Sequence, residues 1–231
     1  MNEYEIKNSK QVSLSDNVRF RCMRCAKCCR NLKGTVIIEA LDAWRMAKQL
    51  SMTVTDFYET YTEIFFMEQV EYPIFALKTV GKEQACVFLN GKKCSVQAMK
   101  PRTCRVYPFW IGPGETPERF TYNLSTEQRH HPNGSLVKVK RWMKENLTDD
   151  EKRFLAEDYK VMKVIAPLYN KIRGFRSDDT ELLKLLLLYR CYFYETEEPF
   201  FPQFERNNRC LIRQLNRMVE NLEKEGRCSD V

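Results

Sequence analysis

The sequence predicts an α+β fold: a small cysteine-rich domain with short strands and helices, followed by a helical C-terminal region. Up to about residue 145, short apolar runs rich in β-branched and aromatic residues alternate with turn signals and two helical patterns. After that point, apolar residues recur every three or four positions over three long segments. We therefore expect a flexible N-terminal segment at 1–18, a cysteine-rich domain at 19–145 and a helical region at 146–231 that packs on it.

The cysteine-rich domain is expected to contain two helices among short strands. The helix at 38–50 has apolar residues three positions apart, and Thr55 is the expected N-cap of the helix at 53–66. The Gly and Pro residues of 111–118 predict a loop. Short strands are predicted at 34–38, 73–80, 85–89, 119–124 and 135–139.

Three helices are predicted in the C-terminal region, at 152–172, 178–195 and 202–226. Thr148 and Glu151 have the spacing of a capping box before the first of them, which contains Pro167 as an expected kink. The second is apolar on most sides, which indicates a central position. The third should be opened by Pro202 and closed by Gly226.

The chain shows no targeting or membrane signal. The start "MNEYEIKNSKQVSLSDN" has no apolar core, so we do not interpret it as a signal peptide. The richest apolar run, at 182–194, is too short and too charged to span a bilayer. We therefore expect a cytoplasmic protein, because clustered cysteines in a reducing compartment serve as metal ligands or redox groups instead of forming disulfides.

A first group of cysteines lies in "RFRCMRCAKCCRNLKG", at Cys22, Cys25, Cys28 and Cys29. Two residues between cysteines let the chain fold back so that both sulfurs reach one metal. The same spacing begins the bacterial ferredoxin pattern. Adjacent side chains usually point apart. We therefore expect Cys28 and Cys29 to serve different centres, or one of them to support the ligands or act as a redox thiol.

A second group comprises Cys86, Cys94 and Cys104, in a stretch without Asp or Glu from 84 to 114. Basic residues surround both groups, and nearby cations favour the thiolate, which is the form that binds metal. Aromatic residues beside Cys104 could shield a cluster from water: Tyr107, Phe109 and Trp110. For the basic residues, a solvated face is almost as good an interpretation as a role beside the thiolates. For the aromatic residues, an ordinary hydrophobic core is the alternative to a shield.

The net charge of +7 does not by itself indicate a nucleic-acid partner. Metal-bound thiolates would supply negative charge that the count leaves out. The segment "VKVKRWMK" at 137–144 is only a faint match to a recognition helix, so we do not expect nucleic-acid binding.

The combined pattern, C-x₂-C-x₂-CC followed by "CVFL…C" and "KPRTCRVYPF", resembles the YkgJ-like cysteine-cluster family, whose motif is written CxxCxxCC. The resemblance covers roughly residues 20–142 and implies a zinc- or iron-chelating domain that is widespread in bacteria and whose molecular role is mostly unassigned. All seven clustered cysteines match family positions. The family often carries a further cysteine in a Cys-Pro-Gly segment, where this chain has His131 with Pro132 and Gly134.

His131 either replaces that cysteine or leaves the position lost. Imidazole is a competent ligand for zinc and iron, and the two histidines of the chain, His130 and His131, both lie here. The alternative is a solvated turn, because "HHPNG" is typical of turns. With His131, eight ligands are available, which is enough for two four-ligand sites or one larger cluster. We interpret Cys191, Cys210 and Cys228 as ordinary thiols.

Zinc and a 4Fe–4S cluster both fit this ligand set. Zinc accepts Cys₃His, whereas the ferredoxin-like spacing slightly favours a cluster on Cys22, Cys25 and Cys28 with a remote fourth ligand. We predict a metal-binding protein that binds a metal ion or cluster, and a protein partner remains open. The alternative is an enzyme, because the family resembles the cysteine-rich part of flagellin lysine-N-methylases, which modify proteins and depend on S-adenosylmethionine. No G-x-G-x-x-G, Ser-His-Asp or HExxH pattern supports it.

Overall fold

A computed structural model describes residues 9–20, 25–67, 72–126, 134–176 and 180–229. The predicted α+β fold is confirmed: helices combine with short antiparallel strands in small sheets, and the C-terminal region is helical. The chain divides into two compact units, a first unit of residues 1–38, 61–63 and 75–157 and a second unit of residues 39–60, 64–74 and 158–231. We describe each unit separately.

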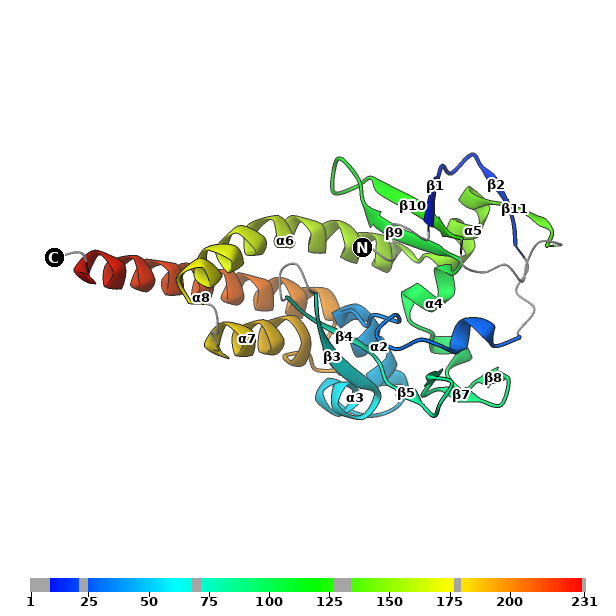
Figure 1. The fold of residues 1–231 in the computed structure, drawn as a ribbon, viewed down its shortest axis with the longest axis horizontal. Helices are drawn as coiled ribbons and strands as arrows, with labels where there is room; N and C mark the ends of the chain where they lie inside the picture. The colour runs from blue at the N-terminus through cyan, green and yellow to red at the C-terminus, as the bar shows by residue number, and fades with distance from the viewer. Residues whose placement is uncertain (1–8, 21–24, 68–71, 127–133, 177–179, 230–231) are drawn as a thin grey trace. The chain divides into compact units, whose positions relative to one another are not determined.

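The first unit contains a three-stranded antiparallel sheet in the order β1-β10-β9 (Figure 1). Its strands are β1 (Ser9–Val12), β10 (Phe120–Ser125) and β9 (Phe109–Pro113). A second antiparallel pair joins β2 (Asn17–Arg19) to β11 (Leu136–Lys138). The strand predicted at 119–124 is thus confirmed as β10, and the strand predicted at 135–139 as β11.

A small hydrophobic core lies under these strands. It is built from Val12, Val18, Phe109, Val139 and Met143, with Trp142 packed against it. Val139 and Met143 belong to α5 (Val139–Asn146), and α5 contacts α4 (Arg102–Val106). The indole Nε1 of Trp142 donates to the Val106 carbonyl at 3.0 Å. This contact helps to hold α4, which carries Cys104.

The expectation of a loose segment at 1–18 is wrong for residues 9–18, whereas residues 1–8 lie outside the described part. Val12 lies opposite Tyr122 in the β1–β10 register, and Val18 lies opposite Val137. Between the strands, the Ser13 amide donates to Asp16 Oδ2 at 2.9 Å and closes a turn. The polar composition of residues 9–18 gave no strand signal of its own. These strands form by pairing with β10 and β11, which lie more than a hundred residues away in the chain.

Short hairpins occupy the middle of the first unit. β5 (Thr79–Val80) pairs with β6 (Ala85–Cys86), and β7 (Leu89–Asn90) pairs with β8 (Lys93–Cys94). The single strand predicted at 85–89 is therefore two strands separated by a turn. A 3₁₀ turn, η2 (Gln97–Met99), follows β8.

Two further predictions for the first half of the chain need correction. The strand expected at 34–38 is reduced to one bridge between Ile37 and Ala76, since the residues before Ile37 form turns. Part of the loop expected at 111–118 is strand, because β9 continues to Pro113. The strand predicted at 73–80 is interrupted: it forms β4 (Tyr72–Leu77) and then β5.

The second unit begins with α2 (Ala40–Gln49) and α3 (Val54–Tyr61), followed by β3 (Thr62–Met67). The helix predicted at 53–66 therefore ends early. The β-branched and aromatic residues from Thr62 onward adopt a strand that pairs with β4. The cap of α3 is Thr53, not Thr55: its Oγ1 accepts from the Asp56 amide at 3.0 Å.

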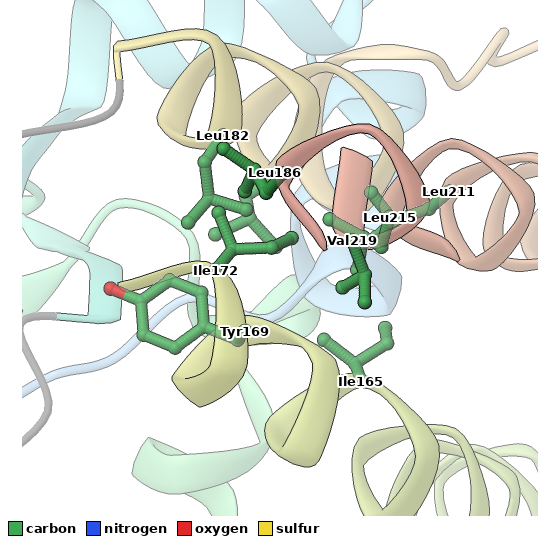
Figure 2. Packing of buried hydrophobic residues seen from close by; sticks show 9 residues of the cluster. Ile165, Tyr169, Ile172, Leu182, Leu186, Leu211, Leu215 and Val219 are labelled. Carbon is green, nitrogen blue, oxygen red and sulfur yellow. The ribbon is translucent and has the colours of Figure 1, made fainter. Parts of the chain in front are cut away.

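Three long helical segments complete the chain: α6 (Asp149–Phe175), α7 (Thr180–Leu187) and α8 (Phe200–Ser229). The side chains of the second-unit core converge from all three (Figure 2). These residues are Ile165, Tyr169, Ile172, Leu182, Leu186, Leu211, Leu215, Val219 and Leu222. Leu182 and Leu186 are each 1% exposed, which agrees with the predicted central position of that helix.

The capping box is confirmed at the start of α6. The Thr148 amide donates to Glu151 Oε2 at 2.9 Å, and the Glu151 amide donates to Thr148 Oγ1 at 3.3 Å. Pro167 lies inside the helix. No helix in the part of the chain that the structure describes has the length and apolar character needed to cross a membrane.

The last two predicted helices differ from expectation at their ends. The helix predicted at 178–195 stops at Leu187 and continues as a π-helical turn, η3 (Leu188–Tyr192), where Arg190 pairs with Asp158 and donates to Asn208 Oδ1 at 2.9 Å. α8 begins at Phe200, so Pro202 lies in its first turn, where no amide partner is required. It also continues past Gly226, because one glycine costs a helix only about 1 kcal/mol.

Candidate metal centre

Five of the clustered cysteines line one cavity of 660 Å³ in the first unit, which we call the cysteine cavity. They come from four short elements: η1 (Lys27–Cys29), β6, β8 and α4. The cavity therefore joins the two sequence groups, which lie more than fifty residues apart in the chain. The five thiols are Cys28, Cys29, Cys86, Cys94 and Cys104.

The first two thiols are placed by a tight turn. Ala26 adopts a left-handed conformation with φ of 60°, and the Cys29 amide then donates to the Ala26 carbonyl at 3.1 Å. In the resulting 3₁₀ helix, Cys28 and Cys29 both line the cavity, with their Sγ atoms 4.0 Å apart. The expectation that these adjacent side chains point apart is wrong, because it assumed extended backbone.

Cys86 and Cys94 are held by the two hairpins. Cys86 lies opposite Thr79 in the β5–β6 pair, and Cys94 lies opposite Leu89 in the β7–β8 pair. The Cys86 side chain is buried, and the amide of Phe88 donates to its sulfur. Amide donors of this kind stabilise a thiolate ligand once a metal has displaced its proton.

Cys104 lies on α4, directly after the Lys-Pro-Arg-Thr segment. Its amide donates to the Pro101 carbonyl at 3.0 Å, which starts the short helix. The next residue, Arg105, forms an ion pair with Glu151, the buried carboxylate of the capping box. The start of α6 and the Cys104 helix are thereby tied together within the first unit.

Arg30 connects the two sides of the cavity. Its Nε donates to Glu83 Oε2 at 2.7 Å, its Nη1 to the Ala26 carbonyl at 3.0 Å and its Nη2 to the Gly91 carbonyl at 3.3 Å. The neighbouring Asn31 amide donates to the Glu83 carbonyl at 2.9 Å. We call this set the Arg30 clamp, since one side chain fixes the Cys28–Cys29 turn against the segment that carries Cys86 and Cys94.

Burial in the cavity favours the protonated form of two of its thiols. Burial raises the pKa of Cys86 and of Cys104, and neighbouring thiols add to both shifts while Lys100 opposes them. The hydrogen bond between Cys28 and Cys29 raises the pKa of Cys28 and lowers that of Cys29 to about 6, a lowering to which Lys100 and Arg30 contribute. A metal ion reverses the preference for protonated thiols, because it displaces their protons.

The remaining predicted ligands are not in this lining. Cys25 is described and partly buried, but it does not line the cavity. Cys22, His130 and His131 lie outside the described residues. Within the ranges that the structure describes, no three Cys, His, Asp or Glu side chains are already arranged to hold one metal ion.

The other cysteines lie in the second unit. Cys191 belongs to η3, where Tyr58 hydrogen-bonds its sulfur, and Cys210 is a partly buried residue of α8. Cys228 is in the last turns of α8, and its side chain lies outside the described part.

Comparison with protein families returns one match for the part of the chain that forms this cavity. Residues 21–134 match the CxxCxxCC domain, described as a "putative zinc- or iron-chelating domain". This part of the chain is similar to the CxxCxxCC family. The match spans all seven clustered cysteines and His131, and no solved structure matches the chain. The family description names metal chelation and no reaction, so it gives no support to the lysine-methylase alternative.

The cysteine cavity also has contacts and lining residues that the sequence did not predict. The Arg30 clamp depends on carbonyl groups and on a glutamate 53 residues away, so no local spacing indicates it. Of the three aromatic residues suggested as a shield, Tyr107 and Trp110 line the cavity, whereas Phe109 belongs to the core under the sheet. Because successive side chains of a strand point to opposite faces, the neighbouring positions of Phe109 and Trp110 could have predicted that only one of them lies in the core.

Proposed function

We propose that the cysteine cavity binds a thiolate-ligated metal centre, and that an iron–sulfur cluster occupies it. The observation that carries the proposal is the convergence of five thiols, from positions as distant as Cys28 and Cys104, on one cavity. No aspartate or glutamate is among the described residues of its lining. A site with sulfur donors and no hard oxygen ligands suits zinc or iron–sulfur chemistry and does not suit magnesium or calcium.

The ligands are proposed in two sets. Cys28, Cys29, Cys86, Cys94 and Cys104 already share the cavity. Cys22, Cys25 and His131 complete the set through the C-x₂-C-x₂-CC spacing and the family position of His131. Metal binding then draws Cys25 toward the Cys28–Cys29 turn, from which it is separated by two residues.

Two observations favour a cluster over a single zinc ion. The spacing of Cys22, Cys25 and Cys28 is that of bacterial ferredoxins. In addition, five thiols around a 660 Å³ cavity exceed what one tetrahedral ion uses. When bound, a cluster would supply one-electron redox chemistry, and the protein's thiols, Lys100 and the Phe88 amide would hold and tune it. Zinc remains the second candidate, because the family description covers both metals.

The location that fits this function is a reducing one. Free thiols at this density persist in a compartment that keeps cysteines reduced, so we propose the cytoplasm. The proposed role is that of a metal-binding domain. Among the described residues of the cavity, no groups besides the thiols and the cations already named are positioned as a set that supports a catalytic role.

The test is metal analysis of protein purified without oxygen. An iron–sulfur protein will be brown, with broad visible absorption and iron and acid-labile sulfide in equal amounts. A colourless protein with stoichiometric zinc would select the second candidate. Protein that is free of both metals, even after reconstitution with iron and sulfide or with zinc, would refute the proposal.

A further inference from the structure

One exposed surface of the first unit combines apolar and basic side chains, and it takes no part in the cysteine cavity. It is formed by β2, β11 and the start of α5, with the turn that precedes β2 (Figure 1). Val18 of β2 is buried in the core and lies opposite Val137, so the alternate positions of both strands face outward. We call this the β2–β11 surface. Its residues, all exposed, are Leu14, Arg19, Leu136, Lys138, Lys140 and Lys144.

Strand pairing brings these residues together from distant parts of the chain. Leu136 lies directly opposite Arg19 in the β2–β11 register. The Leu14 carbonyl accepts from the Lys140 amide at 3.1 Å, so the turn after β1 is attached to the start of α5. Lys144 follows Lys140 by four residues, which places the two on one side of the helix. The two leucines and the four cations therefore share one surface.

The apolar part of this surface is unusually open to solvent. Leu136 is 62% exposed, more than any other large hydrophobic side chain in the part of the chain that the structure describes. Leu14 is 38% exposed. A single exposed leucine needs no explanation. Two exposed leucines beside four cations, however, have the composition of elements that lie in the headgroup region of a membrane.

The four cations are not neutralised by acids of the same chain. Among the described residues, none of the four takes part in an ion pair. The acids closest to them in the sequence have other partners. Asp16 accepts from the Ser13 amide at 2.9 Å and from the Ser13 hydroxyl at 3.1 Å, and Glu145 accepts from Arg141 at 2.8 Å. The surface is thus complementary to an anionic partner.

The residue types favour a lipid surface over a protein or a nucleic acid. Protein interfaces are enriched in arginine and aromatic residues and depleted of lysine, whereas three of these four cations are lysines. Binding of single-stranded nucleic acids uses exposed aromatic rings, but Trp142 of α5 is half-buried and donates to the Val106 carbonyl. The lysine ammonium is a point charge without a fixed geometry, which suits mobile headgroups.

We propose that the β2–β11 surface binds the face of an anionic lipid membrane. Leu14 and Leu136 insert among the headgroups, and the four cations lie against the lipid phosphates. This inference goes beyond the proposed function and is independent of it, because none of these residues lines the cysteine cavity. The two can therefore fail separately.

The experiment is cosedimentation of the full chain with lipid vesicles. The probe is phosphatidylcholine with about one third phosphatidylglycerol, and vesicles of phosphatidylcholine alone are the neutral control. We expect at least 10-fold stronger binding to the anionic vesicles, since each cation near such a surface contributes about 5-fold. Binding should weaken at about 1 M salt, where the Debye length is about 3 Å. No sedimentation with anionic vesicles, or equal binding to both kinds, would overturn the inference.

Variants locate the binding surface. Lys138→Gln should weaken vesicle binding about 5-fold, and Leu136→Gln about 5–10-fold. The matched controls are Arg213→Gln and Val164→Gln, which replace an exposed cation and an exposed apolar residue of the second unit. Both controls should bind as the unmodified chain does. Equal losses in all four variants would overturn the placement of the membrane on this surface.

A last comparison separates a lipid surface from an acidic polymer. Poly-uridylate and polyglutamate are titrated into the unmodified chain and into Leu136→Gln, because a partner recognised by charge alone does not depend on the leucine. Tight polymer binding, together with vesicle binding that Leu136→Gln leaves unchanged, would overturn the lipid assignment. Thermal melts check that each variant is folded, and Leu14→Gln repeats the test if Leu136→Gln is not.

Discussion

Cys86 shows most directly what a metal would have to do at the proposed centre. Its side chain is 7% exposed and lies beside other thiols. Its sulfur also accepts a hydrogen bond from the Phe88 amide, and this bond is stronger to a thiolate than to a thiol. Burial raises its pKa, so the thiolate is costly until a cation compensates for it. Metal binding at such a residue is therefore coupled to folding.

Replacement of Cys86 or Cys104 by Ser should lower both metal content and thermal stability, because the hydroxyl does not supply a thiolate donor. Cys210→Ser is the matched control: the residue lies in the second unit and should leave metal content unchanged. Metal analysis and a thermal melt on the same samples check this prediction. Full metal content in both cavity variants would contradict the assignment of these thiols.

His131 offers a second test at the scale of one residue. If it takes the place of the family's further cysteine, His131→Ala should lose metal and His131→Cys should restore it with an all-thiolate shell. A turn residue, in contrast, would tolerate alanine without any change in metal stoichiometry. Metal content of the three proteins, prepared in parallel, decides between these outcomes.

Cys191 should make stability depend on alkaline pH. Burial raises the pKa of Cys191 from 9.0 to about 12. The contribution of Cys191 to the free energy of unfolding is complete below pH 9 and is lost as pH rises toward 12, because the thiol of the unfolded chain releases its proton first. Urea unfolding should show that the free energy of unfolding is lower at pH 10.5 than at pH 8. This decrease should be smaller in Cys191→Ala than in the unmodified protein. An equal decrease in both proteins would assign the effect to other groups, such as the buried phenols.

At the scale of elements, the Arg30 clamp should set the affinity of the cavity for metal. Arg30→Met removes three hydrogen bonds that join the Cys28–Cys29 turn to the hairpin segment. We expect metal affinity to fall about 10-fold, as for other partners that orient ligands, with a smaller loss in Arg30→Lys. Competition with a chromophoric chelator measures it. Arg119→Met, which removes an exposed ion pair of the same unit, should have no effect.

The elements that the sequence predicted well are those whose determinants are local. The Thr148–Glu151 box and the presence of three C-terminal helices needed only spacing along the chain. β1 and the strand from Thr62 were not predictable in this way. β1 owes its structure to β10, and the β-branched residues after α3 extend a helical pattern until β4 pairs with them.

The candidate site follows the same division. The cysteine pattern predicted two groups of ligands but left open which thiols share a centre, because metal-ligand spacing is local within each group; the structure places five of the thiols in one cavity. The pattern did not predict that Cys28 and Cys29 would share a cavity, since that depends on the left-handed Ala26. The separation of Trp110 from Phe109 and the partners of Arg30 depend on tertiary contacts. The ligand roles of Cys22, Cys25 and His131 stay predictions.

At the scale of the whole molecule, each unit has a hydrophobic core of its own, and only the first contains the cysteine cavity. Removal of metal should therefore loosen the two units unequally. We expect hydrogen exchange to accelerate in peptides from β9 and β10 after chelation, whereas peptides from the middle of α8 keep their protection. Mass spectrometry of exchanged peptides measures this, and uniform loss of protection across both units would show that they unfold together.

The convergence of distant thiols on one cavity also has a consequence for how the chain is made. Cys104 is translated 75 residues after Cys29. At about 5–20 residues per second, the first thiol group waits roughly 4–15 s on the ribosome before the last cavity cysteine has been synthesised. During that interval, Cys28 and Cys29 are a pair of neighbouring thiols without their metal site, open to oxidants and to unsuited ions. The proposed function therefore predicts that these thiols stay reduced during that interval, and that the proposed centre is completed only after the strands and α4 have brought its two halves together.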